Sequence, residues 1–371
     1  CRARENFFDC ACMTTIQALH DSAWQGVLHI TGGGGSVLSE LLAVPGASRT
    51  LLDATIPYAN AALTQLLGGV PEQAASSATA RALAMAGYQR AKLLGNGDLF
   101  GLGCTASLVT DRSKRGSTRA HWVIQTAAAT EEYCLPLSAA ATRSEQEQAL
   151  REAIIDSLGM ALLGQPTTAA LTGQHLATEA WQPLLGNSPY RWCRGAHDGL
   201  LILPGSFNPV HDGHYQMLAA AEQLTGMTGA FELTLRNADK PDLDYLSAAE
   251  RLEAISGQPV WLTNQASFAA KAELFPKATF VLGTDTMARI GEPRFYHNSV
   301  KARDEAIESL HRLGIRFLVL GRIAQQRFVT LADLALPERL AELCTSVPES
   351  VYRNDLSSTQ LRAANRPGSR E

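Results

Sequence analysis

Short apolar runs alternate with helically spaced apolar positions through the second half of the chain. Runs of four or five residues predict buried strands at Leu200–Leu203, Phe231–Leu235, Pro259–Leu262, Thr279–Leu282 and Arg316–Leu320. Between these runs, the helical spacing of apolar residues predicts helices at Ala248–Ile255 and Val300–Leu313. This alternation predicts a parallel sheet with right-handed crossovers. Because such sheets bind ligands at the carboxyl ends of their strands, the loops after Leu203, Leu235 and Leu282 are predicted to face one cleft.

The first half of the chain ends in a predicted amphipathic helix over Glu145–Leu163. The stretch 164–197 that follows has scattered prolines and glycines and no clear period, which is typical of a linker. A chain of 371 residues is long enough for two domains of about 150 residues each. We therefore predict two α/β domains, one at 13–163 and a second, Rossmann-like domain with a parallel sheet at 198–366.

Composition excludes several classes of partner. With 32 basic and 36 acidic residues, the net charge of −4 gives no overall attraction to nucleic acid or to anionic membranes. No apolar run approaches the roughly 20 residues of a membrane span, and no signal-peptide core is present, so we expect a cytoplasmic protein. The seven cysteines are scattered without a CxxC pair, which favours reduced thiols and no metal site. Met13 opens the first foldable stretch, so residues 1–12 are interpreted as a leader or a mis-assigned start. A homo-oligomer is left open.

The stretch Leu200–His214, LLILPGSFNPVHDGH, carries the most specific pattern. Its apolar run breaks at Gly205, where the backbone can turn sharply, and a helical pattern starts after Asp212. The helix N-terminus should therefore point into the loop, which is a geometry that binds anions. Taken alone, the HDGH segment is equally well read as a turn with a capping aspartate.

Six positions of this stretch resemble a family motif. The GxFxPxHxGH element of the nucleotidylyltransferases is matched by Gly205, Phe207, Pro209, His211, Gly213 and His214. The resemblance implies that the loop, with Ser206 and Asn208, holds the triphosphate of a nucleotide. A phosphate of the second substrate then attacks the α-phosphorus and pyrophosphate leaves.

A second resemblance lies far along the chain at Leu356–Arg362, LSSTQLR, which is similar to the family's ISSTxxR element. Ser357 or Ser358 is placed to cap a helix, and Thr359 with neighbouring amides can cradle the outer phosphates. Arg362 can pair with those phosphates through two hydrogen bonds. By itself this segment reads as an ordinary capped helix, and the pairing with the first motif favours the functional interpretation.

The two histidines suit the chemistry that this resemblance implies. Nucleotidyl transfer depends on in-line positioning and on neutralising charge at the leaving group. We assign His211 and His214 as donors to the α- and β-phosphate oxygens, where their hydrogen bonds strengthen as charge builds up. No general base is required, because the attacking phosphate oxygen is already anionic. Mg²⁺ is expected to arrive with the nucleotide, since it commonly binds through substrate phosphates.

Further candidates lie in the loops after two later strands. Gly283 and Asp285 match a GxD element, and the resemblance implies that Asp285 accepts hydrogen bonds from a ribose or an amide. The alternative is that Asp285 caps a helix beginning at Thr286. Lys240 resembles a lysine that meets phosphate in mononucleotide adenylyltransferases, although a solvated surface lysine fits the pattern as well. The weaker candidates are Arg251, Arg322 and Trp261.

The first half resembles another family, with two replacements at positions that matter for its chemistry. Residues 31–48, TGGGGSVLSELLAVPGAS, and Tyr58 resemble the CinA C-terminal family, which includes nicotinamide-mononucleotide amidohydrolases. Thr31 falls at the position of the family's nucleophilic serine, and Leu63 at that of its lysine. Because leucine cannot activate a hydroxyl, we predict that the amidohydrolase activity is lost. The alternatives are a nucleophilic Thr31 or a reactive Cys104. The glycine loop is predicted to bind a nucleotide through its amides or to be a flexible connection.

Taken together, the two resemblances predict a nucleotidylyltransferase that transfers AMP from ATP to nicotinate or nicotinamide mononucleotide. The alternatives within the superfamily are an enzyme using CTP with an alcohol phosphate, and one using ATP with phosphopantetheine. A different class also stays open, in which both domains bind ligands and the protein senses pyridine nucleotides without catalysis.

Overall fold

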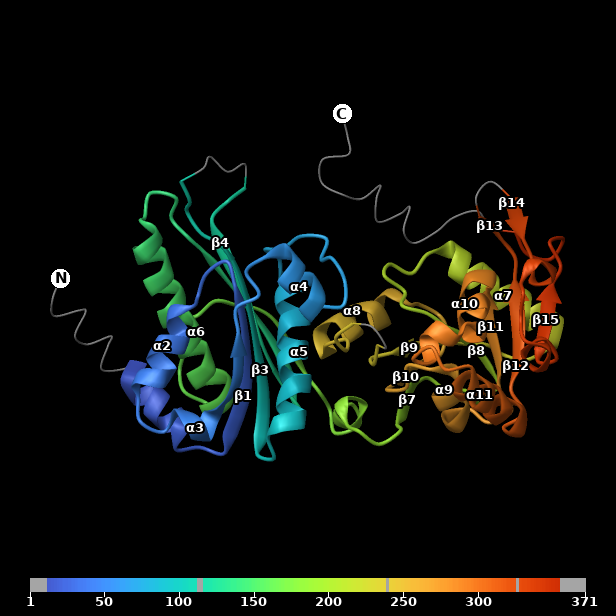
Figure 1. The fold of residues 1–371 in the computed structure, drawn as a ribbon, viewed down its shortest axis with the longest axis horizontal. Coiled ribbons are helices and arrows are strands. Elements are labelled where there is room, and N and C mark those ends of the chain that lie inside the picture. Colours follow the sequence, from blue (N-terminus) through green and yellow to red (C-terminus); the bar gives the residue numbers. More distant parts are fainter. Residues whose placement is uncertain (1–11, 112–115, 238–239, 325–326, 354–371) are drawn as a thin grey trace. The chain divides into compact units, whose positions relative to one another are not determined.

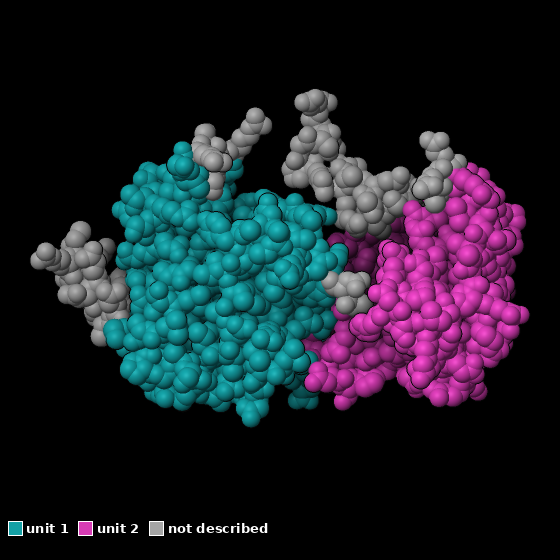
Figure 2. Space-filling view, viewed as in Figure 1, with its two compact units in different colours: residues 1–182, 239–247 teal, residues 183–238, 248–371 magenta. Residues whose placement is uncertain are grey.

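The computed structural model describes residues 12–111, 116–237, 240–324 and 327–353. The chain divides into two compact units, coloured separately in Figure 2. Unit 1 comprises residues 1–182 and 239–247, and unit 2 comprises 183–238 and 248–371. Each unit is built on its own β-sheet with helices, so the chain is a two-domain α/β protein. No helix among these residues is long and apolar enough to cross a membrane.

Unit 1 holds a mixed six-stranded sheet in the order β2-β1-β3-β4-β5-β6 (Figure 1). Its strands are β1 (Trp24–Thr31), β2 (Leu51–Thr55), β3 (Asp98–Ser107), β4 (Arg119–Thr126), β5 (Ala129–Pro136) and β6 (Leu171–Leu176). Its helices are one over residues 12–20, α2 (Ser36–Ala43), α3 (Ala47–Thr50), α4 (Asn60–Leu66), α5 (Ser77–Leu94) and α6 (Arg143–Leu163). The β1–β2 and β1–β3 pairs are parallel, and the remaining pairs are antiparallel.

Helices cover both faces of this sheet. In Figure 1, α2 and α6 lie against one face and α5 against the other. The first face carries the main core, in which the rings of Trp122 and Tyr133 stack with their centroids 5.4 Å apart. On the second face α5 approaches so closely that a Cβ on Gly101 would stand 2.1 Å from the Ala84 carbonyl oxygen. The predicted helix at the end of this half is α6, which begins with a capping box between Thr142 and Glu145.

Unit 2 holds a seven-stranded sheet in the order β15-β12-β11-β8-β9-β10-β7. The strands are β7 (Arg191–Arg194), β8 (Leu201–Pro204), β9 (Ala230–Thr234), β10 (Val260–Thr263), β11 (Thr279–Gly283), β12 (Arg316–Leu320) and β15 (Cys344–Val347), and β13 (Arg322–Ala324) with β14 (Arg327–Val329) forms a separate hairpin. The helices are α7 (Asp212–Thr225), α8 (Tyr245–Ala254), α9 (Phe268–Leu274), α10 (Thr284–Gly291), α11 (Val300–Arg312) and α12 (Glu338–Ala341), and short 3₁₀ turns are η1 (Gln182–Leu185), η2 (Pro293–Tyr296) and η3 (Leu331–Asp333). All pairs of this sheet are parallel except β10–β7.

The strand order of unit 2 is that of a doubly wound α/β sheet. Numbered from β8 as the first strand, the parallel strands run 6-5-4-1-2-3 across the sheet. The order reverses between β8 and β11, and ligands of such sheets bind in the crevice outside the carboxyl ends at this switch point. The loop that starts at Gly205 follows β8, and the Gly283–Asp285 segment follows β11. The fold thus brings two sequence-predicted segments to one crevice.

The stretch 164–197, expected to be a linker, contains two edge strands and a 3₁₀ turn. β6 pairs antiparallel with β5 in unit 1, and β7 pairs antiparallel with β10 in unit 2. Most side chains of β6 are exposed and β7 reads RWCR, so neither has the apolar run that reveals a buried strand. Edge strands of this kind bond through their backbone on one side, which a polar sequence allows.

Candidate functional site

The loop after β8 is fixed to the sheet by backbone and ring contacts. The Gly205 N–H donates to the Glu232 carbonyl oxygen on β9 over 3.0 Å. The next buried residue, Phe207, has a φ of 45° and folds its ring back over Gly205, where a Cβ would stand 2.6 Å from that ring. The Phe207 ring packs edge-on against Phe231 and His214, with centroid distances of 5.0 and 5.1 Å. The motif therefore needs a glycine two residues before this aromatic ring.

His211 and His214 lie together at the N-terminus of α7. His211 is the N-cap residue and Asp212 is the first helical residue, so the alternative of an aspartate cap does not hold. The backbone N–H of His211 donates to Nδ1 of His214 over 3.2 Å, and the two ring centroids are 3.9 Å apart. Because Nδ1 of His214 accepts, its neutral ring carries the proton on Nε2. His214 therefore presents a hydrogen-bond donor from the start of a helix.

Both imidazoles are held in the neutral form. Burial and the neighbouring His211 lower the pKa of His214 to about 4. Burial also lowers the pKa of His211, against a smaller opposing effect of Asp212. At neutral pH the pair thus supplies hydrogen-bond donors without two adjacent positive charges. An anionic ligand would favour protonation of either ring, since an opposite charge stabilises the charged form.

A buried ion pair lies where the loop joins the sheet. The fully buried Glu232 carboxylate accepts from Lys271 Nζ on α9 over 2.6 Å and also from the Thr263 hydroxyl on β10. The carbonyl of the same glutamate holds Gly205. Paired and hydrogen-bonded on both oxygens, Glu232 keeps two strands and a helix in register beneath the loop. Sequence reasoning missed this network because its members are far apart along the chain.

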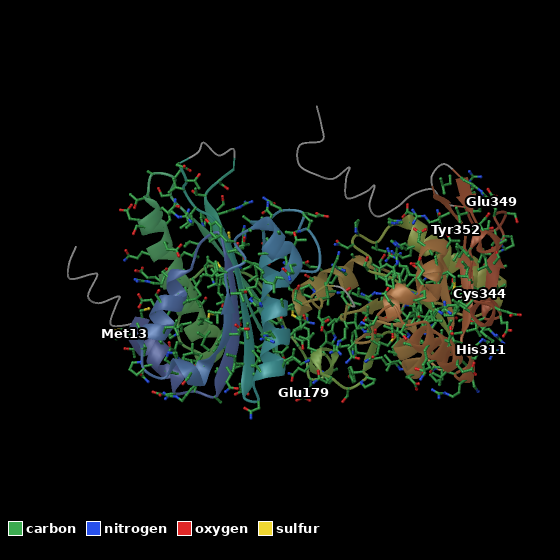
Figure 3. The ribbon with its side chains drawn as sticks, in the orientation of Figure 1. Met13, Glu179, His311, Cys344, Glu349 and Tyr352 are labelled. Carbon is green, nitrogen blue, oxygen red and sulfur yellow. The ribbon has the colours of Figure 1, made fainter. Side chains whose placement is uncertain are left out.

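Two further side chains contact the loop and the start of α7. Arg251 Nη1 on α8 donates to the Ser206 carbonyl oxygen over 2.9 Å. The hydroxyl of Tyr352, labelled in Figure 3, donates to the Gly213 carbonyl oxygen over 3.4 Å. Tyr352 is next to the last described residue, so the described chain reaches the first turn of α7. The segment with Ser357, Ser358, Thr359 and Arg362 follows it and lies outside the described residues.

At the carboxyl end of β11, Asp285 pairs with Arg322. The helix α10 begins at Thr284 with Gly283 as its N-cap, so Asp285 sits in the first turn and is not the cap that the alternative interpretation required. Its carboxylate forms an ion pair with Arg322, which follows the neighbouring strand β12. Both side chains are half-exposed. The carboxylate expected to meet a ribose or an amide is therefore engaged by a guanidinium.

Two sequence candidates are not among the residues of these contacts. Lys240 is exposed and belongs to unit 1, where a Cβ on Gly69 would stand 3.5 Å from its Cε. Its expected phosphate contact stays a prediction. Trp261 is buried in the core of unit 2 and donates from Nε1 to His197 over 3.1 Å.

The candidate residues of unit 1 meet in one small pocket. Thr31, Tyr58 and Leu63 all line a cavity of about 180 Å³, together with Arg143 at the start of α6. The Thr31 hydroxyl donates to the Pro57 carbonyl oxygen over 3.0 Å. Leu63, at the position of the family's lysine, is buried in an apolar cluster, so an aliphatic side chain stands where a base would be needed. Arg143 donates to the Tyr58 hydroxyl over 3.5 Å and was missed by sequence reasoning.

The glycine loop of unit 1 is occupied by a side chain of its own unit. The Glu147 carboxylate on α6 accepts from the backbone N–H groups of Gly34 over 2.8 Å and of Ser36 over 3.1 Å. Gly35, the N-cap of α2, has no side-chain cap, so Glu147 supplies one from another helix. Two of the amides expected to bind a nucleotide are thus already paired with an anion.

Cys104 does not provide the reactive thiol considered from the sequence. It is completely buried in the core of unit 1, and burial strongly raises the pKa of its thiol. A thiolate is the nucleophilic form of cysteine, and this environment disfavours it. The Cys104 thiol instead lies 3.7 Å from the Gly33 carbonyl oxygen, which makes it a packing element behind the glycine loop.

Comparison with known proteins adds a family match for unit 2. Residues 202–364 match the family model described as cytidylyltransferase-like. The matched segment includes the loop after β8 and both histidines. A comparison with curated proteins found no match.

Solved structures similar to part of the chain include CinA-type proteins. A CinA superfamily protein from Klebsiella pneumoniae is 12% identical, with 42% of this chain and 99% of that chain covered and a TM-score of 0.36. One from Escherichia coli is 15% identical, covering 42% and 90%, with a TM-score of 0.35. The CihA protein from Agrobacterium tumefaciens is 14% identical, covering 42% and 94%, with a TM-score of 0.34. The matched part is the N-terminal portion of the chain.

Proposed function

We propose that unit 2 is a nucleotidylyltransferase that transfers AMP from ATP to nicotinate or nicotinamide mononucleotide and releases pyrophosphate. The observation that carries this proposal is the histidine pair at the N-terminus of α7. His214 offers Nε2–H beside a helix N-terminus, at the switch point where a doubly wound sheet binds its ligand. The cytidylyltransferase-like family match supports the coarser assignment to nucleotidyl transfer.

The residues of the crevice would act by positioning and by stabilising charge. The phosphate of the acceptor attacks the α-phosphorus in line with the bond to pyrophosphate, which breaks as the new bond forms. The two imidazoles donate to phosphate oxygens whose negative charge grows during this step. Because the attacking oxygen is already anionic, the site needs no general base. Mg²⁺ enters as part of the nucleotide substrate.

The choice of nucleotide and acceptor is the finer part of the proposal. The description of the matching family favours CTP as a second candidate, with an alcohol phosphate as the acceptor. The pyridine mononucleotide is preferred because the LSSTQLR element and the CinA-type resemblance of the first half point to the same metabolite. This preference rests on association and not on a contact.

For unit 1 we infer a domain without amidohydrolase activity. Leu63 packs in an apolar cluster, and the Thr31 hydroxyl donates to a backbone carbonyl, so among the described residues no side chain accepts its proton. If unit 1 only binds ligands, the chain pairs an enzyme with a binding domain. A purely sensory protein is the opposing candidate, and it predicts nucleotide binding without pyrophosphate release.

The test is pyrophosphate release by the full chain with Mg²⁺. ATP and CTP are each offered against nicotinate mononucleotide, nicotinamide mononucleotide, phosphopantetheine and an alcohol phosphate, and ammonia is assayed in the same mixtures. The expected result is release with ATP and a pyridine mononucleotide, without ammonia. Release with CTP and an alcohol phosphate alone would overturn the pyridine assignment, and binding without any release would favour the sensor. Release of ammonia from nicotinamide mononucleotide would show that unit 1 has amidohydrolase activity and would contradict our inference for this unit.

A further inference from the structure

Arg251 contacts the backbone of the loop that follows β8. Its Nη1 donates to the Ser206 carbonyl oxygen over 2.9 Å. The flanking residues are held in other ways, Gly205 by the Glu232 carbonyl and Phe207 by its buried ring. Arg251 therefore supports the exposed middle of this short stretch, from a helix that is separated from it in sequence by 45 positions.

The contact with Arg251 also sets the direction of the Phe207 N–H, because this N–H and the Ser206 carbonyl belong to the same planar peptide group. That peptide bond is trans, so its carbonyl and its N–H point in opposite directions. With the Ser206 carbonyl directed at Arg251, the Phe207 N–H points away from it. Among the described residues no backbone carbonyl accepts a hydrogen bond from this N–H. Since backbone donors of buried residues rarely stay unpaired, this one is suited to an anionic oxygen.

We propose that Arg251 is a positioning residue of this phosphate-binding loop. By holding the Ser206 carbonyl, it turns the Phe207 N–H toward the oxygens of the nucleotide phosphates. The inference rests on the proposed function, because it takes the loop as the site of those phosphates. A guanidinium suits the role because it stays charged at every relevant pH and its hydrogen bond to a carbonyl is charge-assisted. Its charge also favours anions beside the loop.

The test is the Arg251→Met variant of the full chain, with Mg·ATP binding measured by calorimetry in the absence of acceptor. Methionine keeps an apolar stem and removes the guanidinium. We expect binding about tenfold weaker, since a charge-assisted hydrogen bond that orients a donor is lost. Arg251→Lys keeps the charge and one donor, so it should lose less. Added guanidinium ion, at a concentration far below denaturing levels, should restore much of the affinity of Arg251→Met.

The matched control is Arg303→Met. Arg303 belongs to the same unit and also donates to a backbone carbonyl, that of Gly291 over 3.4 Å, but not to the loop. We expect its ATP affinity to equal that of the wild type. Wild-type affinity in Arg251→Met, an equal loss in Arg303→Met, or no restoration by guanidinium would each overturn the proposal. CTP replaces ATP in all arms if it is the nucleotide that the wild type binds.

These outcomes separate the inference from the proposed function. Weaker binding in Arg251→Met with no pyrophosphate release by the wild type supports the positioning role and contradicts the enzyme. Pyrophosphate release by the wild type together with unchanged ATP binding in Arg251→Met supports the enzyme and contradicts the positioning role. A wild-type chain that binds neither nucleotide contradicts both.

Discussion

The two units each lead a parallel strand through a glycine-containing loop into a helix, and the two loops are used differently. In unit 1, β1 runs through Gly32–Gly35 into α2, and the Glu147 carboxylate already accepts from amides of this turn. In unit 2, β8 runs through the loop that starts at Gly205 into α7, where His211 and His214 add donors of their own. The unit 1 loop has four glycines and the unit 2 loop has one, yet it is the unit 2 loop that has hydrogen-bond donors available for an anion.

Glycine content alone therefore does not identify a phosphate-binding loop. Glycines let a backbone turn and bring amides close together, but an internal carboxylate can satisfy those amides as well as a ligand can. What distinguishes the unit 2 loop is that its neighbours are donors. Arg251 holds a carbonyl and His214 presents Nε2–H, so the groups around this loop complement negative charge.

The largest expected effect comes from removing the Nε2 donor of His214. In His214→Asn the side-chain oxygen can still accept from the His211 N–H, but nothing replaces Nε2. Turnover should fall about 10²- to 10³-fold, because a donor that strengthens in the transition state is lost. His214→Gln, whose amide nitrogen reaches farther, should lose less, and His211→Asn should also slow turnover. Steady-state pyrophosphate release checks this, and His214→Asn turning over at half the wild-type rate or better would assign the pair a structural role.

Much of unit 2 could be predicted from the sequence because its strands are buried on both faces. The strand Arg316–Leu320 has the same bounds as β12, and the other expected strands differ from the observed ones by about one residue. The histidines at the start of a helix were also predictable, since the motif fixes both the turn and the cap. The residues of this motif are adjacent in sequence, so they determine the local backbone geometry without distant contacts.

The missed features depend on contacts between distant positions. Glu147 and Gly34 are separated by 113 positions, and no local pattern of α6 reveals that its glutamate caps another helix. Arg251 was only a weaker candidate from the sequence, because the Ser206 carbonyl that it contacts lies 45 positions away. The strands β6 and β7 were missed for a different reason, because an edge strand needs no apolar run. The sequence therefore predicted the position of the unit 2 loop better than the residues that hold it.

The next effect concerns the pH dependence of stability in unit 2. The pKa of His214 is lowered from 6.5 to about 4, mainly by burial, so the unfolded chain binds a proton more readily than the folded one between these values. This group's stabilising contribution is present above pH 6.5 and is lost as the pH falls toward 4. The drop amounts to about 3 kcal/mol. In His214→Asn the free energy of unfolding, measured by denaturant titration, should depend less steeply on pH in this window, and an unchanged dependence would contradict the burial of the ring.

A smaller effect is expected from the carboxylate that occupies the unit 1 loop. Glu147→Ala removes the acceptor of two backbone N–H groups, which should lower stability by about 1–2 kcal/mol. Phosphate should then raise the melting temperature of Glu147→Ala more than that of the wild type, because an anion can replace the lost carboxylate. Gln148→Ala, on the same helix, is the control and should melt like the wild type. Equal stabilisation of all three proteins by phosphate would show that Glu147 does not exclude anions from this loop.

The central claim is that only the unit 2 loop binds a nucleotide triphosphate, and the stoichiometry of Mg·ATP binding tests it most directly. Calorimetry on the full chain should show one site, which is lost in the His211→Asn, His214→Asn double variant and kept in Glu147→Gln. The Gly34 and Ser36 amides bind separate oxygens of the carboxylate, so the single oxygen of the glutamine keeps one of these two bonds and leaves the unit 1 loop partly capped. Two sites in the wild type, or a site that survives the double histidine variant, would contradict the account.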